Sequence, residues 1–133
     1  MKAARKISGS WLPALVWATI IFGFSARSQA PHVSQKPQFQ LAVQKFGHAT
    51  EYAILAFLVY RALRRGHQLP LRRAAILAAL IAALYGVSDE WHQSFVPGRA
   101  CLLSDMAIDA TGGLLAATAL YAHESRRSQQ TNR

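Results

Sequence analysis

The sequence predicts an all-α integral membrane protein, a bundle of four transmembrane helices with both termini cytoplasmic. It contains four long apolar runs, short basic clusters between them, and acidic residues concentrated in a few places. The chain is 52% hydrophobic and 16% charged, with a net charge of +9, whereas soluble domains carry about 25% charged residues. Because the basic residues flank apolar runs and do not line a soluble surface, we expect a lipid bilayer and no nucleic acid as partner.

A spanning helix needs about 20 mostly apolar residues. The predicted helices cover about residues 7–24, 46–63, 74–93 and 102–122, and a polar, frayed tail follows at 123–133. These runs are too long and too rich in Ala and Leu for strands, and they lack period-two alternation. The connections read as a polar loop at 25–44, a basic loop at 64–73 and a Pro-Gly turn within 94–101. We therefore expect residues 1–133 to form one transmembrane domain.

The first apolar run has an alternative interpretation as a cleaved signal peptide, because it follows the basic start MKAARK. Its length of about 18 residues exceeds the usual 7 to 15 of such peptides. The small residues Ser28 and Ala30 are also followed by Pro31, which is unfavourable for cleavage. The sequence favours a retained helix.

The distribution of basic residues predicts the orientation, since positive charge marks the cytoplasmic side. The basic residues divide into Lys2, Arg5, Lys6, Arg61, Arg64, Arg65, Arg72, Arg73, Arg126, Arg127 and Arg133 at the termini and second connection, and Arg27, Lys36, Lys45 and Arg99 elsewhere. The first group holds eleven of the fifteen. Both termini are therefore predicted to be cytoplasmic, with the 25–44 loop and the Pro97-Gly98 turn outside.

Five of the six acidic residues, all but Glu124, then fall at the outer ends of the second, third and fourth helices. The candidate functional cluster comprises Lys45, His48, Glu51, Tyr52, Asp89, Glu90, His92, Gln93, Arg99, Asp105 and Asp109. A charged residue in the middle of a membrane helix costs about 2.5–3.5 kcal/mol, less near an interface. Such residues therefore usually mark a functional site.

Helical spacing arranges the cluster. Lys45, His48 and Glu51 share one face, as do Asp105 and Asp109. In the third helix Asp89, His92 and Gln93 share a face, and Glu90 points about 100° away. Arg99 is expected to fold back towards Asp105 or Glu90, because a bidentate pair best offsets desolvation.

Several of these residues have simpler interpretations. Lys45 can extend to the interface, His48 and Glu51 can form a helix-packing hydrogen bond, and Asp105 can cap its helix. Gly112 and Gly113 favour close helix packing, and the single cysteine, Cys101, reads as a packing residue.

Four residues of the cluster offer donor atoms for a metal ion. The candidate ligands, His48, Glu51, Glu90 and His92, have suitable types and spacings for zinc or another divalent ion. Neither pairing matches H-E-x-x-H and no cysteine accompanies them. The sequence therefore predicts no metal and no cofactor.

Four motifs resemble the VanZ-like family of small bacterial membrane proteins. They are I-F-G-F-S at 21–25, K-F-G-H-A-T-E-Y-A-I-L at 45–55, S-D-E-W-H-Q-S-F-V-P-G-R at 88–99 and D-M-A-I-D-A-T-G-G at 105–113. The resemblance covers about residues 7–122. Cys101 and Leu102 depart from it, since more polar or smaller residues are expected there. Every member of the cluster except Lys45 is carried over as a motif position without an assigned role.

The resemblance implies the bacterial cytoplasmic membrane and a role in the cell envelope. The member that gives the family its name is linked to resistance to teicoplanin. The first hypothesis for the function is a protein that modulates glycopeptide (teicoplanin-type) sensitivity by engaging a cell-wall or lipid component at the outer leaflet. Two alternatives stay open: a membrane enzyme using the Asp/Glu/His cluster for acid–base or metal-assisted chemistry on a lipid head group, and a structural or oligomer-forming bundle. The sequence predicts neither an oligomeric state nor a catalytic residue.

Overall fold

The computed structural model describes residues 2–26, 37–97 and 102–131. Within these ranges every regular element is a helix, as predicted. The helices are α1 (Lys2–Ser25), α2 (Pro37–Arg65), α3 (Leu71–Gln93) and α4 (Leu103–Thr131). Gly98, Arg99 and Cys101, on which three of the predictions fall, lie outside the described residues.

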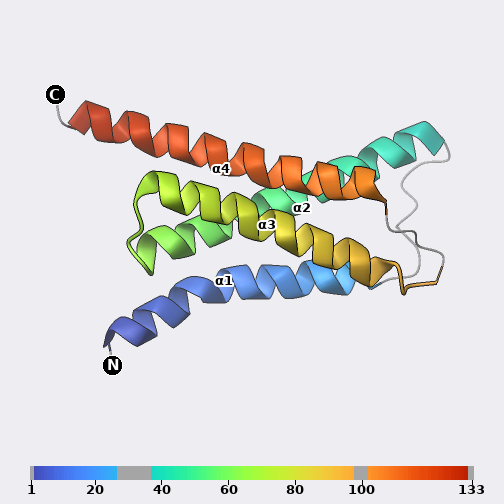
Figure 1. Ribbon diagram of the computed structural model, residues 1–133, viewed down its shortest axis with the longest axis horizontal. Coiled ribbons are helices and arrows are strands. Elements are labelled where there is room, and N and C mark those ends of the chain that lie inside the picture. The colour runs from blue at the N-terminus through green and yellow to red at the C-terminus, as the bar shows by residue number, and fades with distance from the viewer. Residues whose placement is uncertain (1, 27–36, 98–101, 132–133) are drawn as a thin grey trace.

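The helices run alternately up and down, so that the start of α1 and the end of α4 lie at the same end of the bundle (Figure 1). The most extensive contact is between α2 and α4. Helix α3 packs against both of them, and α1 packs against α2 and α3. The ends of α2, α3 and α4 that carry the predicted cluster therefore meet at one end of the bundle.

The core consists of stripes of residues spaced by four, the spacing that aligns side chains along one helix face. On α2 the stripe is Tyr52, Ala56 and Tyr60, all buried. On α3 it is Ala74, Ala78, Ala82 and Gly86, and on α4 it is Gly113 and Ala117. Small residues dominate two of the three stripes, and they let the helices approach closely.

Two predicted boundaries were wrong. Helix α2 begins at Pro37, so residues 37–44, predicted as loop, are helical. Proline is well suited to the first position of a helix, where its missing N–H is not needed. Helix α4 continues to Thr131 through the predicted frayed tail. That stretch has no Gly or Pro to interrupt it, and Glu124 bonds to Arg64 of α2.

The predicted basic loop is also shorter than expected, because only residues 66–70 separate α2 from α3. Gly66 N–H donates to the Ala62 carbonyl at 2.8 Å and ends α2. One guanidinium nitrogen of Arg64 donates to the Leu69 carbonyl at 2.7 Å, which holds the turn against the helix end.

By length and composition, one helix of the described chain, Leu71–Gln93, could cross a membrane, and Gly9–Ser25 is a shorter apolar helix. Helices α2 and α4 are long enough but carry more polar and charged residues. The four-span membrane bundle and the cytoplasmic termini stay predictions.

Candidate functional site

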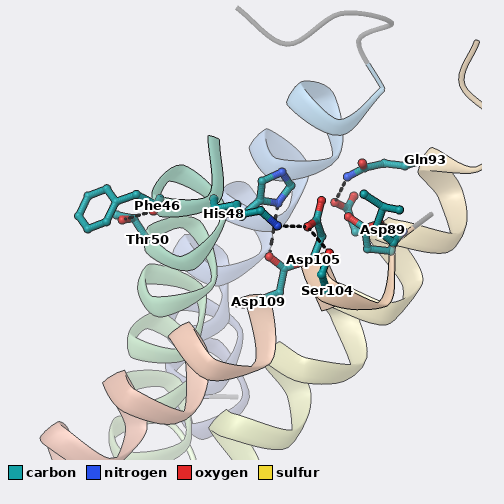
Figure 2. A network of polar contacts seen from close by, with 11 residues as sticks. Phe46, His48, Thr50, Asp89, Gln93, Ser104, Asp105 and Asp109 are labelled. Atoms are coloured by element: carbon teal, nitrogen blue, oxygen red, sulfur yellow. Dashed lines mark hydrogen bonds and ion pairs between the residues drawn. The ribbon is translucent and has the colours of Figure 1, made fainter. Parts of the chain in front are cut away.

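Polar side chains from three helices gather at the end of the bundle opposite the start of α1 and the end of α4. Figure 2 shows His48 on α2 with Asp109 of α4 directed towards it, Asp105 further along α4, and Asp89 and Gln93 on α3 on the other side of the cluster. The predicted convergence of three helices at one level is therefore seen in the structure.

An ion pair and a histidine–carboxylate contact lie one above the other between α2 and α4. The outer one joins Lys45 Nζ to Asp105 Oδ1 at 3.0 Å, with both side chains partly exposed. One turn deeper, His48 Nδ1 lies 3.4 Å from Asp109 Oδ1, and Asp109 is fully buried. The spacings of three on α2 and four on α4 align these pairs.

Helix α3 contributes two further carboxyl groups. Asp89 Oδ2 accepts a hydrogen bond from Gln93 Nε2 at 3.0 Å, one helical turn away. Glu90 Oε2 accepts one from the backbone N–H of Leu102 at 3.2 Å, just before α4 begins. Both acids are buried, Glu90 completely. In each carboxyl group one oxygen therefore accepts a hydrogen bond, and the other oxygen is available for a further contact.

The available atoms are unusual because they are buried. Within the described structure, no hydrogen-bond partner is found for His48 Nδ1, Asp89 Oδ1, Glu90 Oε1 or either carboxylate oxygen of Asp109. The contact from His48 to Asp109 is close but does not have hydrogen-bond geometry. Buried polar atoms are nearly always satisfied in native proteins, so a concentration of unsatisfied ones calls for an explanation.

Glycines position the deepest acid. A Cβ added at Gly112 would lie 2.2 Å from the Ala49 carbonyl oxygen, so α4 contacts the backbone of α2 there. A Cβ at Gly86 would lie 3.0 Å from Asp109 Cβ and 3.3 Å from a ring carbon of Tyr52. The close approach therefore places the Asp109 carboxylate between α2 and α3. The predicted packing role of Gly112 is confirmed.

Three residues, one from each helix, form a set that could hold a metal ion: His48, Glu90 and Asp109. One ligand atom from each lies within 4.8 Å of the others. This set differs from both pairings considered from the sequence, since each of those took its ligands from a single helix.

Other members of the predicted cluster lie elsewhere. His92 stacks on Phe22 of α1 with ring centroids 4.5 Å apart. Tyr52 is buried beneath the acids, and its hydroxyl has no hydrogen-bond partner in the described structure. Glu51 is half-buried, and its carbonyl accepts a hydrogen bond from Trp17 Nε1 at 2.9 Å.

The central position of Glu90 was missed because the α3 face was drawn through Asp89 and His92. In the structure the buried face of α3 consists of Asp89, Glu90 and Gln93. His92 points away from this face and contacts Phe22 of α1. One signal in the sequence indicates this face. Glu90 follows Gly86 by four residues and thus extends the small-residue stripe that packs in the core.

The fold and the site together define a small helical bundle that encloses ionisable groups at one end. The family model described as VanZ/LLP1 matches residues 3–123. The chain belongs to the VanZ-like family. No curated protein and no solved structure matches it.

Proposed function

We propose that this chain is a multi-pass protein of the bacterial cytoplasmic membrane that modulates sensitivity to teicoplanin-type glycopeptides. In this proposal, the polar cluster faces the outer leaflet and engages a lipid or a lipid-linked cell-wall component. The observation that carries it is an inverted polarity: ionisable groups are buried inside the bundle while large apolar side chains cover its outside.

The apolar exterior supports the membrane part of the proposal. Leu12, Leu84 and Leu115, from three different helices, are 60%, 68% and 65% exposed. In the most apolar 18-residue stretch of Leu71–Gln93, only 22% is buried. A core helix of a soluble protein would be mostly buried, and a soluble monomer rarely exposes so much apolar surface. Lipid is the solvent that suits these side chains.

The charge distribution supports the orientation. The arginines at the end of α2, at the start of α3 and near the end of α4 lie at the end of the bundle opposite the cluster (Figure 1). Because positive residues mark the cytoplasmic side, the cluster would face outwards. That is where lipid-linked cell-wall precursors and glycopeptides meet.

The outer ion pair supports an interaction with a head group. Lys45 and Asp105 are 33% and 23% exposed, whereas the His48–Asp109 pair beneath them is largely enclosed. An anionic head group could replace Asp105 as the partner of Lys45, and a cationic one could replace Lys45. Substitution of a partly exposed pair costs little, because such pairs contribute only about 0–1 kcal/mol.

One observation favours the enzyme alternative. A histidine beside a buried carboxylate, as in His48 and Asp109, is the arrangement in which an imidazole is oriented as a general base. Chemistry on a lipid head group would then follow its binding at Lys45 and Asp105, one turn further out than His48 and Asp109.

The proposal is tested with Asp109→Asn in a teicoplanin-sensitive bacterium that expresses the full chain. The matched control is Glu124→Gln, which removes the same charge at the opposite end of the bundle. We expect Asp109→Asn to shift teicoplanin sensitivity most of the way to that of cells lacking the protein, with folded membrane yield retained. Glu124→Gln should behave as the wild type.

A reporter inserted between Gly66 and Pro70 provides the topology arm and should remain cytoplasmic. Export of that reporter would overturn the orientation. If the wild-type chain leaves teicoplanin sensitivity unchanged, the proposed role fails. The structural alternative holds if none of the variants Asp109→Asn, His48→Gln and Glu90→Gln accumulates in the membrane although Glu124→Gln accumulates normally. The cluster would then be needed for folding.

A further inference from the structure

We infer that His48, Glu90 and Asp109 form a binding site for one divalent transition-metal ion. The three residues come from α2, α3 and α4, and each presents a ligand atom within 4.8 Å of the other two. Each also has at least one buried atom without a hydrogen-bond partner in the described structure. This inference concerns the interior of the bundle and does not require the proposed envelope role.

The distances fit a single ion after a small movement. Two ligand atoms that bind one ion tetrahedrally, each at about 2.1 Å, lie about 3.4 Å apart. The widest spacing allowed in this set is 4.8 Å, so closure of at most about 1.4 Å per pair of ligand atoms is needed. Rotation of a carboxylate or an imidazole supplies a shift of that size without moving the helices.

The ligands are oriented by the surrounding structure. The N–H of Leu102 holds Oε2 of Glu90, which leaves Oε1 free to bind. Gly86 and Gly112 allow the helix approach that fixes the backbone of Asp109. Hydrogen bonds and packing that fix the ligand side chains are the usual support of a metal centre.

The charges also call for a cation. Two completely buried carboxyl groups, Glu90 and Asp109, face one imidazole. Lys45, the nearest described ammonium group on α2, is bonded to Asp105 one turn further out. Burial of an uncompensated carboxylate is costly, and a divalent ion would compensate both carboxylates at once.

The ligand set indicates the kind of ion. One imidazole nitrogen and two carboxylate oxygens, with no thiolate, suit Zn²⁺ or Mn²⁺ better than a soft ion. Mg²⁺ and Ca²⁺ prefer sets made entirely of oxygen. Three protein ligands also leave a coordination position open, as in catalytic zinc sites and unlike closed structural ones.

The test uses the full chain, purified in detergent, freed of any affinity tag and stripped with EDTA. After equilibration with Zn²⁺ or Mn²⁺, bound metal is counted by mass spectrometry, and affinity is measured by titration. We expect one ion per chain. His48→Gln, Glu90→Gln and Asp109→Asn should each weaken binding by about tenfold or more.

Asp105→Asn is the matched control, because it makes the same change on the same helix one turn away. It should bind the ion as the wild type does. Equal loss of binding in Asp105→Asn would show diffuse attraction to acids and overturn the site. So would a folded wild type that binds neither ion, or one that binds Mg²⁺ or Ca²⁺ more tightly.

A second measurement does not depend on the variants folding. The wild-type Tm in detergent should rise with Zn²⁺ or Mn²⁺ and fall back with EDTA, because a ligand that binds only the folded state stabilises it. Co²⁺ bound to the wild-type chain should give a visible absorption spectrum typical of a site with nitrogen and oxygen ligands. An unchanged Tm together with no Co²⁺ spectrum contradicts the inference.

Discussion

Helices α2 and α4 are joined at both ends by ionisable side chains, and the two ends differ in how those side chains are satisfied. At one end Arg64 Nε bonds to Glu124 Oε2 at 3.1 Å, and the side chains are 32% and 36% exposed. At the other end His48 and Asp109 lie 3.4 Å apart, and Asp109 has no exposed surface. Water can therefore form hydrogen bonds with the remaining polar atoms of Arg64 and Glu124, but it does not reach the carboxylate oxygens of Asp109.

The surroundings increase this difference. Arg64 also donates to the Leu69 carbonyl, and Arg64 and Glu124 border an open cavity of about 310 Å³. Asp109 is enclosed by Gly86, Tyr52 and the helix crossing at Gly112. A saturated and hydrated pair fits a structural role. A buried group with unsatisfied oxygens fits a binding site, since evolution tolerates its cost only where it serves a purpose.

The largest expected effect comes from Gly112→Ala, which removes the geometry on which the comparison rests. The new Cβ would meet the Ala49 carbonyl oxygen at 2.2 Å, and backbone cannot rotate away as a side chain can. We expect the free energy of unfolding to fall by about 3 kcal/mol, the upper part of the range for overpacking. Denaturant unfolding in detergent measures it.

Gly47→Ala is the control, because a Cβ there meets no atom within 4 Å. It lies in the same part of the bundle and should be neutral or stabilise the helix by up to about 1 kcal/mol. If Gly112→Ala is as well tolerated as Gly47→Ala, α2 and α4 are further apart than the structure has them, and Asp109 is not enclosed.

The sequence predicted the four helices and the part of the bundle where the acids gather, because both depend on local patterns. Apolar runs and helical spacing are properties of single segments. The sequence did not predict that Glu90 would lie close to both His48 and Asp109. That position depends on how α3 is rotated against its neighbours, and the rotation is set by the packing of Ala78, Ala82 and Gly86.

The end of α4 was mispredicted for a related reason. The polar composition of the last residues reads as a frayed tail when taken alone. In the fold Glu124 meets Arg64, which is 60 residues away in the chain, and residues with good helix propensity continue to Thr131. A long-range partner therefore decided a boundary that local composition could not.

An intermediate effect is expected for the buried pair. In a double-mutant cycle, His48→Ala, Asp109→Ala and the double variant are compared by unfolding in metal-free detergent solution. Because the two side chains are in contact and enclosed, we expect a coupling free energy of about 1–3 kcal/mol. A coupling near zero would mean that the two groups act separately and would remove the resemblance to an oriented general base.

The smallest effect is expected for the exposed pair, measured by the same cycle with Arg64→Ala and Glu124→Ala. Both side chains are about one-third exposed, and such pairs contribute about 0.2–1 kcal/mol. Raising the salt from 0.1 M to 1 M should remove most of this coupling, because the Debye length falls from about 10 Å to 3 Å. The coupling of His48 to Asp109 should barely change, since salt does not reach a buried carboxylate. If the exposed pair proves the more strongly coupled and the less sensitive to salt, burial does not separate the two ends, and the reason for assigning the site to the cluster disappears.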